Sequence, residues 1–243
     1  MPAEEVLITR PSGRAAGTLL CLPGTMSAPA IFDGLADRTG ADVVIAPWLA
    51  WPGPHDIATL GARVAELVVE HAPVVLVGHS TGGVIALRAA LHRMRGLAGL
   101  VLSDTGANMR GHGDVDAIIE HVRAAWGPEL WRAVAQRGVH LPVPERIADA
   151  LETYPATLRR SAVIDALTSQ RDTDLAPLLG ELDLPALVVH GRYDRARELR
   201  HATELAELLG APAPVVLECG HTPAAECPES FAAQVRRFLA NLD

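Results

Sequence analysis

The stretch Val74-Val75-Leu76-Val77-Gly78-His79-Ser80-Thr81-Gly82-Gly83 decides the fold class of this chain. Its four consecutive aliphatic residues lie between a proline and a glycine, which predicts a short strand buried on both faces, as in a parallel sheet. Val84, Leu87 and Leu91 then recur at helical spacing. We therefore expect Ser80 at a sharp strand-to-helix turn, between glycines that leave room for the backbone to double back.

Two later segments show the same pattern of an aliphatic strand that runs into a loop. A carboxylate ends the first, Pro185-Ala186-Leu187-Val188-Val189-His190-Gly191-Arg192-Tyr193-Asp194. An imidazole ends the second, Pro214-Val215-Val216-Leu217-Glu218-Cys219-Gly220-His221. A reactive serine needs a base to take its proton and an acid to orient that base. We interpret Ser80 as the nucleophile, Asp194 as the acid and His221 as the base.

With these residues, the chain resembles the α/β-hydrolase superfamily, in its small, single-domain esterase and lactonase branch. The resemblance covers nearly the whole sequence. It implies a serine hydrolase with the α/β-hydrolase fold, in which Ser80, Asp194 and His221 form the catalytic triad. Some members of the superfamily supply the acid from the end of an earlier strand, where this chain has Asp104. Asp104 therefore remains the alternative acid.

The resemblance also implies an oxyanion hole built from backbone N–H groups. The first N–H is expected from Thr25, in the segment Leu19-Leu20-Cys21-Leu22-Pro23-Gly24-Thr25, with Met26 close by. The second is expected from Thr81, the residue after the nucleophile. The family usually has a histidine where this chain has Pro23. That departure keeps the glycine turn, and the group required is a backbone N–H rather than a side chain.

Strands alternate with helices along most of the chain, as a mostly parallel central sheet with helices on both faces requires. The alternation breaks between residues 105 and 177, where the apolar residues recur at helical spacing. We therefore predict an α/β core of residues 1–104 and 178–243, and a helical cap of residues 105–177 between strands six and seven. Trp126 of this cap is expected either to line an apolar acyl pocket or to pack the cap onto the core.

The composition narrows the possible reactions and partners. The net charge of −8 disfavours nucleic acid and anionic membranes as partners. All 21 basic residues are arginine, so the chain has no lysine for a Schiff base or for a Walker motif. The sequence also has no His-Glu-x-x-His motif and no paired Cys-x-x-Cys motif. We therefore expect neither a metal nor a cofactor, and a small molecule as the substrate.

The location is predicted from the amino terminus and from the cysteines. The segment Met1-Pro2-Ala3-Glu4-Glu5 is acidic and has no apolar core, unlike a signal peptide. No apolar run is long enough to cross a membrane. Three cysteines are too few for a disulfide framework. These features favour a cytoplasmic protein, and they leave its oligomeric state open.

Several activities are compatible with these residues. Our leading hypothesis is hydrolysis of a small carboxylic ester or lactone through an acyl-enzyme. An acyl thioesterase is the nearest rival, because a thioester requires the same three side chains. A cyclase or synthase that uses the histidine as a base is another alternative on the same scaffold. A ligand-binding receptor with little turnover is the alternative from a different class, and the fold alone does not rank these functions.

Overall fold

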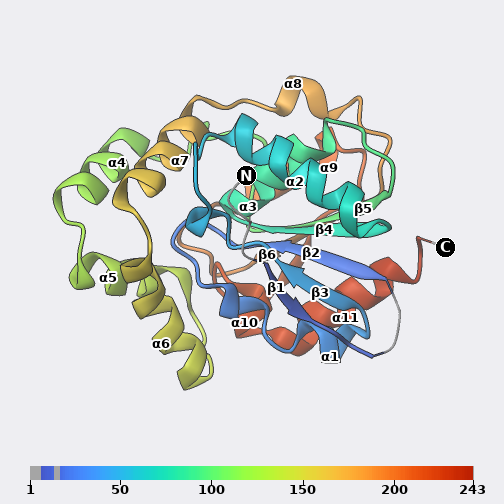
Figure 1. The fold of residues 1–243 in the computed structure, drawn as a ribbon, viewed down its shortest axis with the longest axis horizontal. Coiled ribbons are helices and arrows are strands. Elements are labelled where there is room, and N and C mark those ends of the chain that lie inside the picture. Colours follow the sequence, from blue (N-terminus) through green and yellow to red (C-terminus); the bar gives the residue numbers. More distant parts are fainter. Residues whose placement is uncertain (1–6, 14–16, 243) are drawn as a thin grey trace.

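The computed structural model describes residues 7–13 and 17–242, so the acidic segment of residues 1–5 lies outside the described residues. Its centre is a seven-stranded sheet with the strand order β1-β3-β2-β4-β5-β6-β7 (Figure 1). β1 runs antiparallel to β3, and every other neighbouring pair is parallel. The strands are β1 (Ile8–Arg10), β2 (Thr18–Leu22), β3 (Asp42–Ile45), β4 (Val74–His79), β5 (Leu97–Ser103), β6 (Ala186–Gly191) and β7 (Val215–Leu217).

Helices cover both faces of the sheet, as the aliphatic strands predict (Figure 1). On β2, Leu20 and Leu22 join one core with residues of α2, α3 and α9, whereas Leu19 and Cys21 join a second core with residues of α1 and α11. The helices of the two layers are α1 (Leu35–Thr39), α2 (Ile57–His71), α3 (Thr81–Ala90), α9 (Leu199–Leu208), α10 (Pro223–Glu226) and α11 (Pro228–Leu239). The α/β-hydrolase architecture is thus confirmed.

All of the regular elements between β5 and β6 are helices. They are α4 (Val115–Ala124), α5 (Pro128–Gly138), α6 (Glu145–Thr153), the 3-10 helix η3 (Tyr154–Thr157), α7 (Arg160–Asp172) and α8 (Ala176–Leu179). Figure 1 shows α4 to α7 grouped beyond one end of the sheet. We call residues 105–177 the inserted segment. The predicted position between strands six and seven is wrong, because in the described chain only β1 precedes β2 and the segment therefore follows the fifth strand. Its role as a cap stays a prediction.

Two helices, α2 and α4, begin at an aspartate that caps their first turn. Asp114 accepts a hydrogen bond from the Ala117 amide at 2.9 Å and so caps α4. Asp56 caps α2 in the same way, accepting from the Thr59 amide at 2.8 Å.

Among the described residues, no helix is both long enough and apolar enough to span a bilayer.

Three glycines around Ser80 stand where no side chain fits. A Cβ on Gly78 would lie 2.5 Å from the Gly83 Cα atom, and one on Gly82 would lie 2.1 Å from the Leu22 carbonyl oxygen. The N-terminal turn of α3 therefore packs directly against the backbone of β4 and β2. This contact between backbones is what the sequence predicted for the glycines on either side of the serine.

We expect Gly82→Ala to lower the free energy of unfolding by more than about 3 kcal/mol, because the new methyl group meets a backbone carbonyl that cannot rotate away. Urea unfolding followed by circular dichroism measures this. Gly127→Ala is the matched control, since Gly127 has an extended φ of 166° and no atom lies within 4 Å of the added Cβ. A Gly82→Ala protein as stable as that control would contradict the close-packing argument.

Candidate active site

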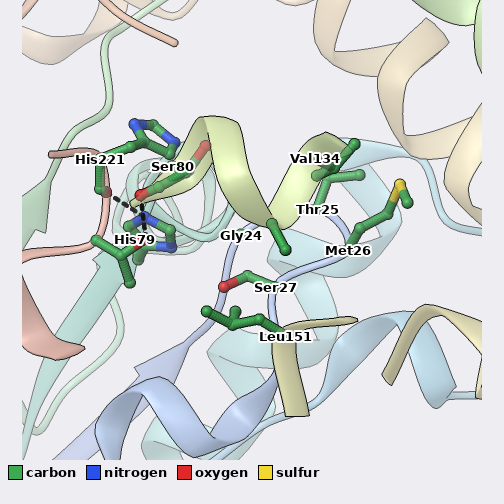
Figure 2. A pocket seen from close by; sticks show the side chains of 12 residues that line it. Gly24, Thr25, Met26, Ser27, His79, Ser80, Val134, Leu151 and His221 are labelled. Atoms are coloured by element: carbon green, nitrogen blue, oxygen red, sulfur yellow. Dashed lines mark hydrogen bonds between the residues drawn. The ribbon is translucent and has the colours of Figure 1, made fainter. Parts of the chain in front are cut away.

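Ser80 sits on a strained turn at the carboxyl end of β4. Its φ of 52° and ψ of −121° lie in a region that non-glycine residues avoid. Both backbone groups of Ser80 are bound to the segment that ends β5. The Ser80 amide donates to the Ser103 carbonyl at 2.9 Å, and the Thr105 hydroxyl donates to the Ser80 carbonyl at 2.7 Å. As a result the Ser80 side chain lines a pocket instead of packing into the core (Figure 2).

His221 lines the same pocket and is oriented by Asp194. Its Nδ1 atom lies 2.7 Å from Asp194 Oδ2, and its side chain is 12% exposed. Figure 2 shows the imidazole beside the Ser80 side chain. The second oxygen of Asp194 accepts from the amides of Ala196 at 2.6 Å and Arg197 at 3.0 Å. The structure therefore brings together the three predicted residues from the ends of β4, β6 and β7.

These contacts keep the Asp194 carboxylate ionised. Burial by itself would raise the pKa of Asp194, but the charge of His221, its hydrogen bond and the two backbone amides together hold that pKa well below its usual range. Hydrogen bonds to the charged form favour that form. An ionised Asp194 opposite Nδ1 places the Nδ1 proton of His221 on the Asp194 side, and it leaves Nε2 free to accept a proton.

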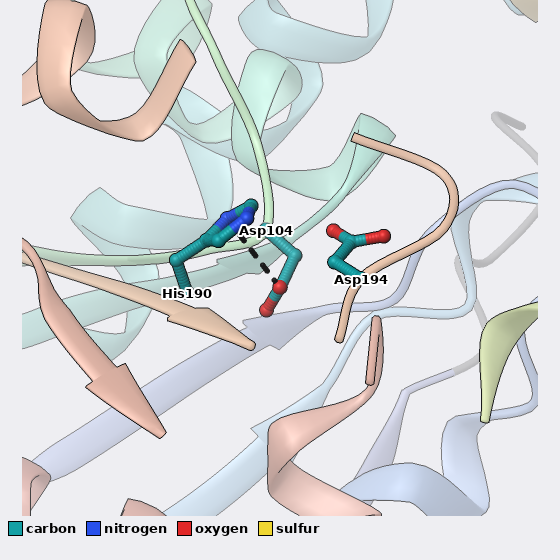
Figure 3. A group of neighbouring side chains, drawn as sticks. All are labelled: Asp104, His190 and Asp194. Atoms are coloured by element: carbon teal, nitrogen blue, oxygen red, sulfur yellow. Dashed lines mark ion pairs between the residues drawn. The ribbon is translucent and has the colours of Figure 1, made fainter. Parts of the chain in front are cut away.

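The alternative acid, Asp104, lies beside Asp194 but has different partners. It is fully buried, accepts from the Ser103 hydroxyl at 2.7 Å and accepts from the Gly191 amide at 2.8 Å. Figure 3 shows it between His190 and Asp194. Burial, followed by the charge of Asp194, raises the pKa of Asp104 well above its usual value. We infer that Asp104 is neutral and Asp194 is ionised, because two neighbouring negative charges in the protein interior repel each other.

Asp104, His190 and Asp194 also have the composition of a metal site, with ligand atoms within 4.8 Å of one another. Their hydrogen bonds argue for another role. Each of the four carboxylate oxygens already accepts a hydrogen bond from the protein. Burial lowers the pKa of His190 to about 4, so its ring is neutral. A neutral imidazole is also the form that binds a metal, so the case against a metal rests on the carboxylate oxygens. We therefore interpret the group as support for Asp194.

His79 supports the loop of His221. Its Nε2 atom lies 2.7 Å from the His221 carbonyl oxygen (Figure 2), and because a carbonyl only accepts, Nε2 carries the proton and donates it. Burial, and then the neighbouring His221, lowers the pKa of His79 to about 3, which keeps the ring neutral. His79 thus ties β4 to the loop that carries His221.

A buried carboxylate, Glu226, holds the same loop from the other side. Its Oε2 accepts from the Gly220 amide at 2.9 Å, and its Oε1 accepts from the Thr222 amide at 3.0 Å, so both neighbours of His221 are bound. Oε2 also accepts from the amides of His140 and Leu141 at 2.7 Å each, in the connection between α5 and α6. One side chain therefore joins the histidine loop to the inserted segment.

The walls of the pocket come from the core and from the inserted segment. The turn after β2 contributes residues 24–27, which the Ser27 amide closes by donating to the Gly24 carbonyl at 3.1 Å. The helices α5 and α6 contribute Val134, Ala135, Gly138 and Leu151. The enclosed volume is about 60 Å³. This is small beside the ~300–1,000 Å³ of typical ligand pockets, so the site as it stands has room for a short group only.

Of the four predicted binding residues, Thr25, Met26 and Thr81 lie near Ser80, whereas Trp126 packs elsewhere. Thr25 and Met26 line the pocket, and Met26 has a φ of 61° that turns the chain there. Thr81 begins α3, where backbone N–H groups have no partner within the helix. Trp126 is not among the residues that line this pocket. It packs on Trp131 with ring centroids 5.7 Å apart and against the core, which is the packing role that the sequence left open.

Sequence reasoning did not single out His79, Glu226 or the pocket residues of α5 and α6. His79 and Glu226 work through backbone groups of other segments, so neither has a partner that a sequence pattern can indicate. The one available signal was position, because His79 precedes the nucleophile and Glu226 follows the base by five residues. Val134 and Leu151 read as ordinary apolar positions of amphipathic helices.

We expect Glu226→Gln to lower the free energy of unfolding by about 2–3 kcal/mol, because an amide NH₂ would face amide donors that now bind a carboxylate oxygen. Urea titration at neutral pH measures the change. Glu229→Gln is the control, since Glu229 is exposed and its ion pair with Arg38 lies at the surface, and the stability of this variant is expected to stay close to that of the wild type. Equal stabilities for the two variants would contradict the role given to Glu226.

Comparisons with known proteins identify the family of this chain. Residues 19–234 match the alpha/beta hydrolase family. A pimeloyl-[acyl-carrier protein] methyl ester esterase of Vibrio campbellii is 26% identical over 74% of this chain and 76% of its own length. A 2-succinyl-6-hydroxy-2,4-cyclohexadiene-1-carboxylate synthase of Serratia proteamaculans is 30% identical over 68% of each chain. An esterase from Exiguobacterium antarcticum, 20% identical, superposes with a TM-score of 0.82 over 96% of this chain and 94% of its own. The chain belongs to the alpha/beta hydrolase family.

Proposed function

We propose that this protein is a serine hydrolase that cleaves a small carboxylic ester or a lactone through an acyl-enzyme on Ser80. The observation that carries the proposal is the 2.7 Å hydrogen bond between Asp194 and His221, whose side chain lines the same pocket as the strained Ser80. A base oriented by an ionised acid beside an accessible hydroxyl is the arrangement that activates serine as a nucleophile. The similarity to a methyl ester esterase supports an ester as the substrate.

In the acylation step, Ser80 Oγ attacks the carbonyl carbon while His221 Nε2 takes the hydroxyl proton. The carbon–oxygen double bond opens, and its electron pair goes to the carbonyl oxygen. Backbone N–H groups of Thr25 and Thr81 are the donors that stabilise this negative oxygen. When the tetrahedral intermediate collapses, the bond to the leaving oxygen breaks, and His221 gives its proton to that oxygen.

Deacylation repeats the sequence with water in the place of the serine. His221 takes a proton from water, the hydroxide oxygen bonds to the acyl carbon, and the bond to Ser80 Oγ breaks as the serine recovers its proton. Asp194 stays ionised throughout and keeps the Nδ1 proton of His221 on its own side. No step requires a metal or an organic cofactor.

The pocket favours short acyl groups. Its volume of about 60 Å³ is bounded by apolar residues of α5 and α6, so a longer acyl chain requires these helices to move. On this basis, we propose that the inserted segment acts as a cap that sets the substrate size. An acyl thioester of similar size meets the same residues and remains an alternative substrate.

A different use of the same residues has one observation in its favour, the similarity to a synthase at 30% identity. In that case His221 and Ser80 would act as a base, and no acyl-enzyme would form. A receptor with little turnover would retain the fold without either reaction. The three readings differ in what happens at the Ser80 oxygen, which makes them separable by experiment.

The test combines a panel of substrates with a covalent probe. p-Nitrophenyl esters of increasing chain length, lactones and acyl thioesters are assayed for hydrolysis, and a fluorophosphonate is used to label the serine. We expect turnover highest for short esters or lactones, together with rapid labelling of Ser80 seen by intact mass. Ser80→Ala should lose about four to six orders of magnitude in kcat and all labelling. Near-normal hydrolysis by Ser80→Ala would refute the proposal, and labelling without hydrolysis of any substrate would favour the synthase.

A second pair of variants identifies the triad acid. We expect Asp194→Asn to reduce kcat roughly a thousandfold or more, because an amide does not hold the Nδ1 proton of His221 in place. Asp104→Asn should reduce kcat by less than about tenfold, since a neutral amide resembles the neutral carboxyl that it replaces. Steady-state kinetics with the best ester measures both. A larger loss in Asp104→Asn than in Asp194→Asn would reverse the assignment.

A further inference from the structure

A chain of three polar side chains connects the inserted segment to both residues of the oxyanion site. The Thr25 hydroxyl donates to the Thr81 hydroxyl at 2.8 Å, and the Thr81 hydroxyl donates to Gln170 Oε1 at 2.8 Å. Gln170 lies on α7, two residues before its end. Thr81 is 3% exposed and Gln170 is 4% exposed, so water does not replace either bond easily.

Gln170, the last acceptor, sets the direction in which these hydroxyl groups donate. A hydroxyl has one proton to donate, and Thr81 gives it to Gln170. The Thr81 oxygen is then open to accept the proton of Thr25. If Gln170 loses its acceptor oxygen, the buried Thr81 hydroxyl either stays without an acceptor or turns toward Thr25, and both arrangements disturb the contact between the two threonines.

The position of this contact gives it a consequence for catalysis. Thr25 belongs to the turn after β2, and Thr81 begins α3 after the nucleophile, so 56 residues separate them in the sequence. Their backbone N–H groups must face one oxygen atom of the substrate together. The bond between the two hydroxyls holds the two segments at one spacing, and Gln170 holds the hydroxyl of Thr81.

We propose that Gln170 is a positioning residue of the oxyanion site, which acts through the hydroxyl groups of Thr81 and Thr25. The inference rests on the proposed serine hydrolase function. It adds a role for the inserted segment that differs from forming pocket walls, because α5 and α6 provide those walls while α7 provides Gln170.

We expect the loss of the Gln170 acceptor oxygen to lower kcat and to leave KM nearly unchanged. Loss of one whole oxyanion donor costs serine hydrolases a factor of about 10²–10³, and a misplacement of 1 Å costs about 10². A loosened pair of donors should therefore cost about tenfold in kcat, with KM within about threefold of the wild type, because the donors act on the charge that develops in the transition state. The rate of labelling by a fluorophosphonate should fall in parallel, since its phosphoryl oxygen occupies the same site.

The experiment compares Gln170→Met, Thr81→Val and the double variant in the full-length protein. Methionine has nearly the length of glutamine without its acceptor oxygen, and valine has the shape of threonine without its hydroxyl. If the two residues act as one unit, the double variant loses no more in kcat than the larger single loss. Thr81→Ser retains a hydroxyl, and it should recover most of the kcat that Thr81→Val loses.

Two variants of the same helix control for a general loosening of α7. The Ser169 hydroxyl accepts from the Ile57 amide at 2.9 Å, so Ser169→Ala removes a different bond between α7 and the core. Thr168→Val removes a hydroxyl that donates within the helix, to the Ile164 carbonyl. Both should keep the wild-type kcat. Thermal unfolding of every variant identifies any protein that is not folded at the assay temperature.

The outcomes separate this proposal from the function on which it rests. Wild-type kcat in Gln170→Met, a loss confined to KM, additive losses in the double variant, or an equal loss in Ser169→Ala would each overturn the role of Gln170. Any of these results with Ser80-dependent hydrolysis leaves the hydrolase function intact. Hydrolysis that survives Ser80→Ala instead refutes the proposed function itself.

Discussion

The turn at Ser80 is the constraint on which the rest of the site depends. A serine with a positive φ is unfavourable in isolation, so the surrounding structure must hold it there. It does so by bringing α3 against the backbone of β2 and β4, at glycines where a Cβ would meet another backbone at less than 3 Å. The hydroxyl is thereby presented at the end of a rigid strand, and the amide of the next residue is left at a helix start.

The other parts of the site reach this turn through backbone groups rather than through side-chain pairs alone. His79 binds the carbonyl of His221, and Glu226 binds the amides on both sides of it. These bonds limit where the imidazole can lie, and the hydrogen bond to Asp194 then selects its proton position. His221 is therefore held by several buried groups, each of which satisfies hydrogen bonds that burial would otherwise leave unmade.

The inserted segment takes part in the site in two ways. α5 and α6 line the pocket, and the connection between them is held to the histidine loop by Glu226. α7 contacts the start of α3 through Gln170. The sheet supplies the turn that carries Ser80, whereas helices between β5 and β6 supply part of the pocket wall.

The sequence by itself determined the sheet, the position of the strand-to-helix turn and the three residues at the strand ends, because aliphatic runs and glycines act over a few neighbouring residues. It left two acids open, Asp104 and Asp194, and two roles open for Trp126. Only the tertiary structure decided which acid bonds to His221, that Trp126 packs on Trp131, and which groups hold the loops. These contacts join residues far apart in the chain through burial and hydrogen-bond geometry, and neither leaves a periodic pattern in the sequence.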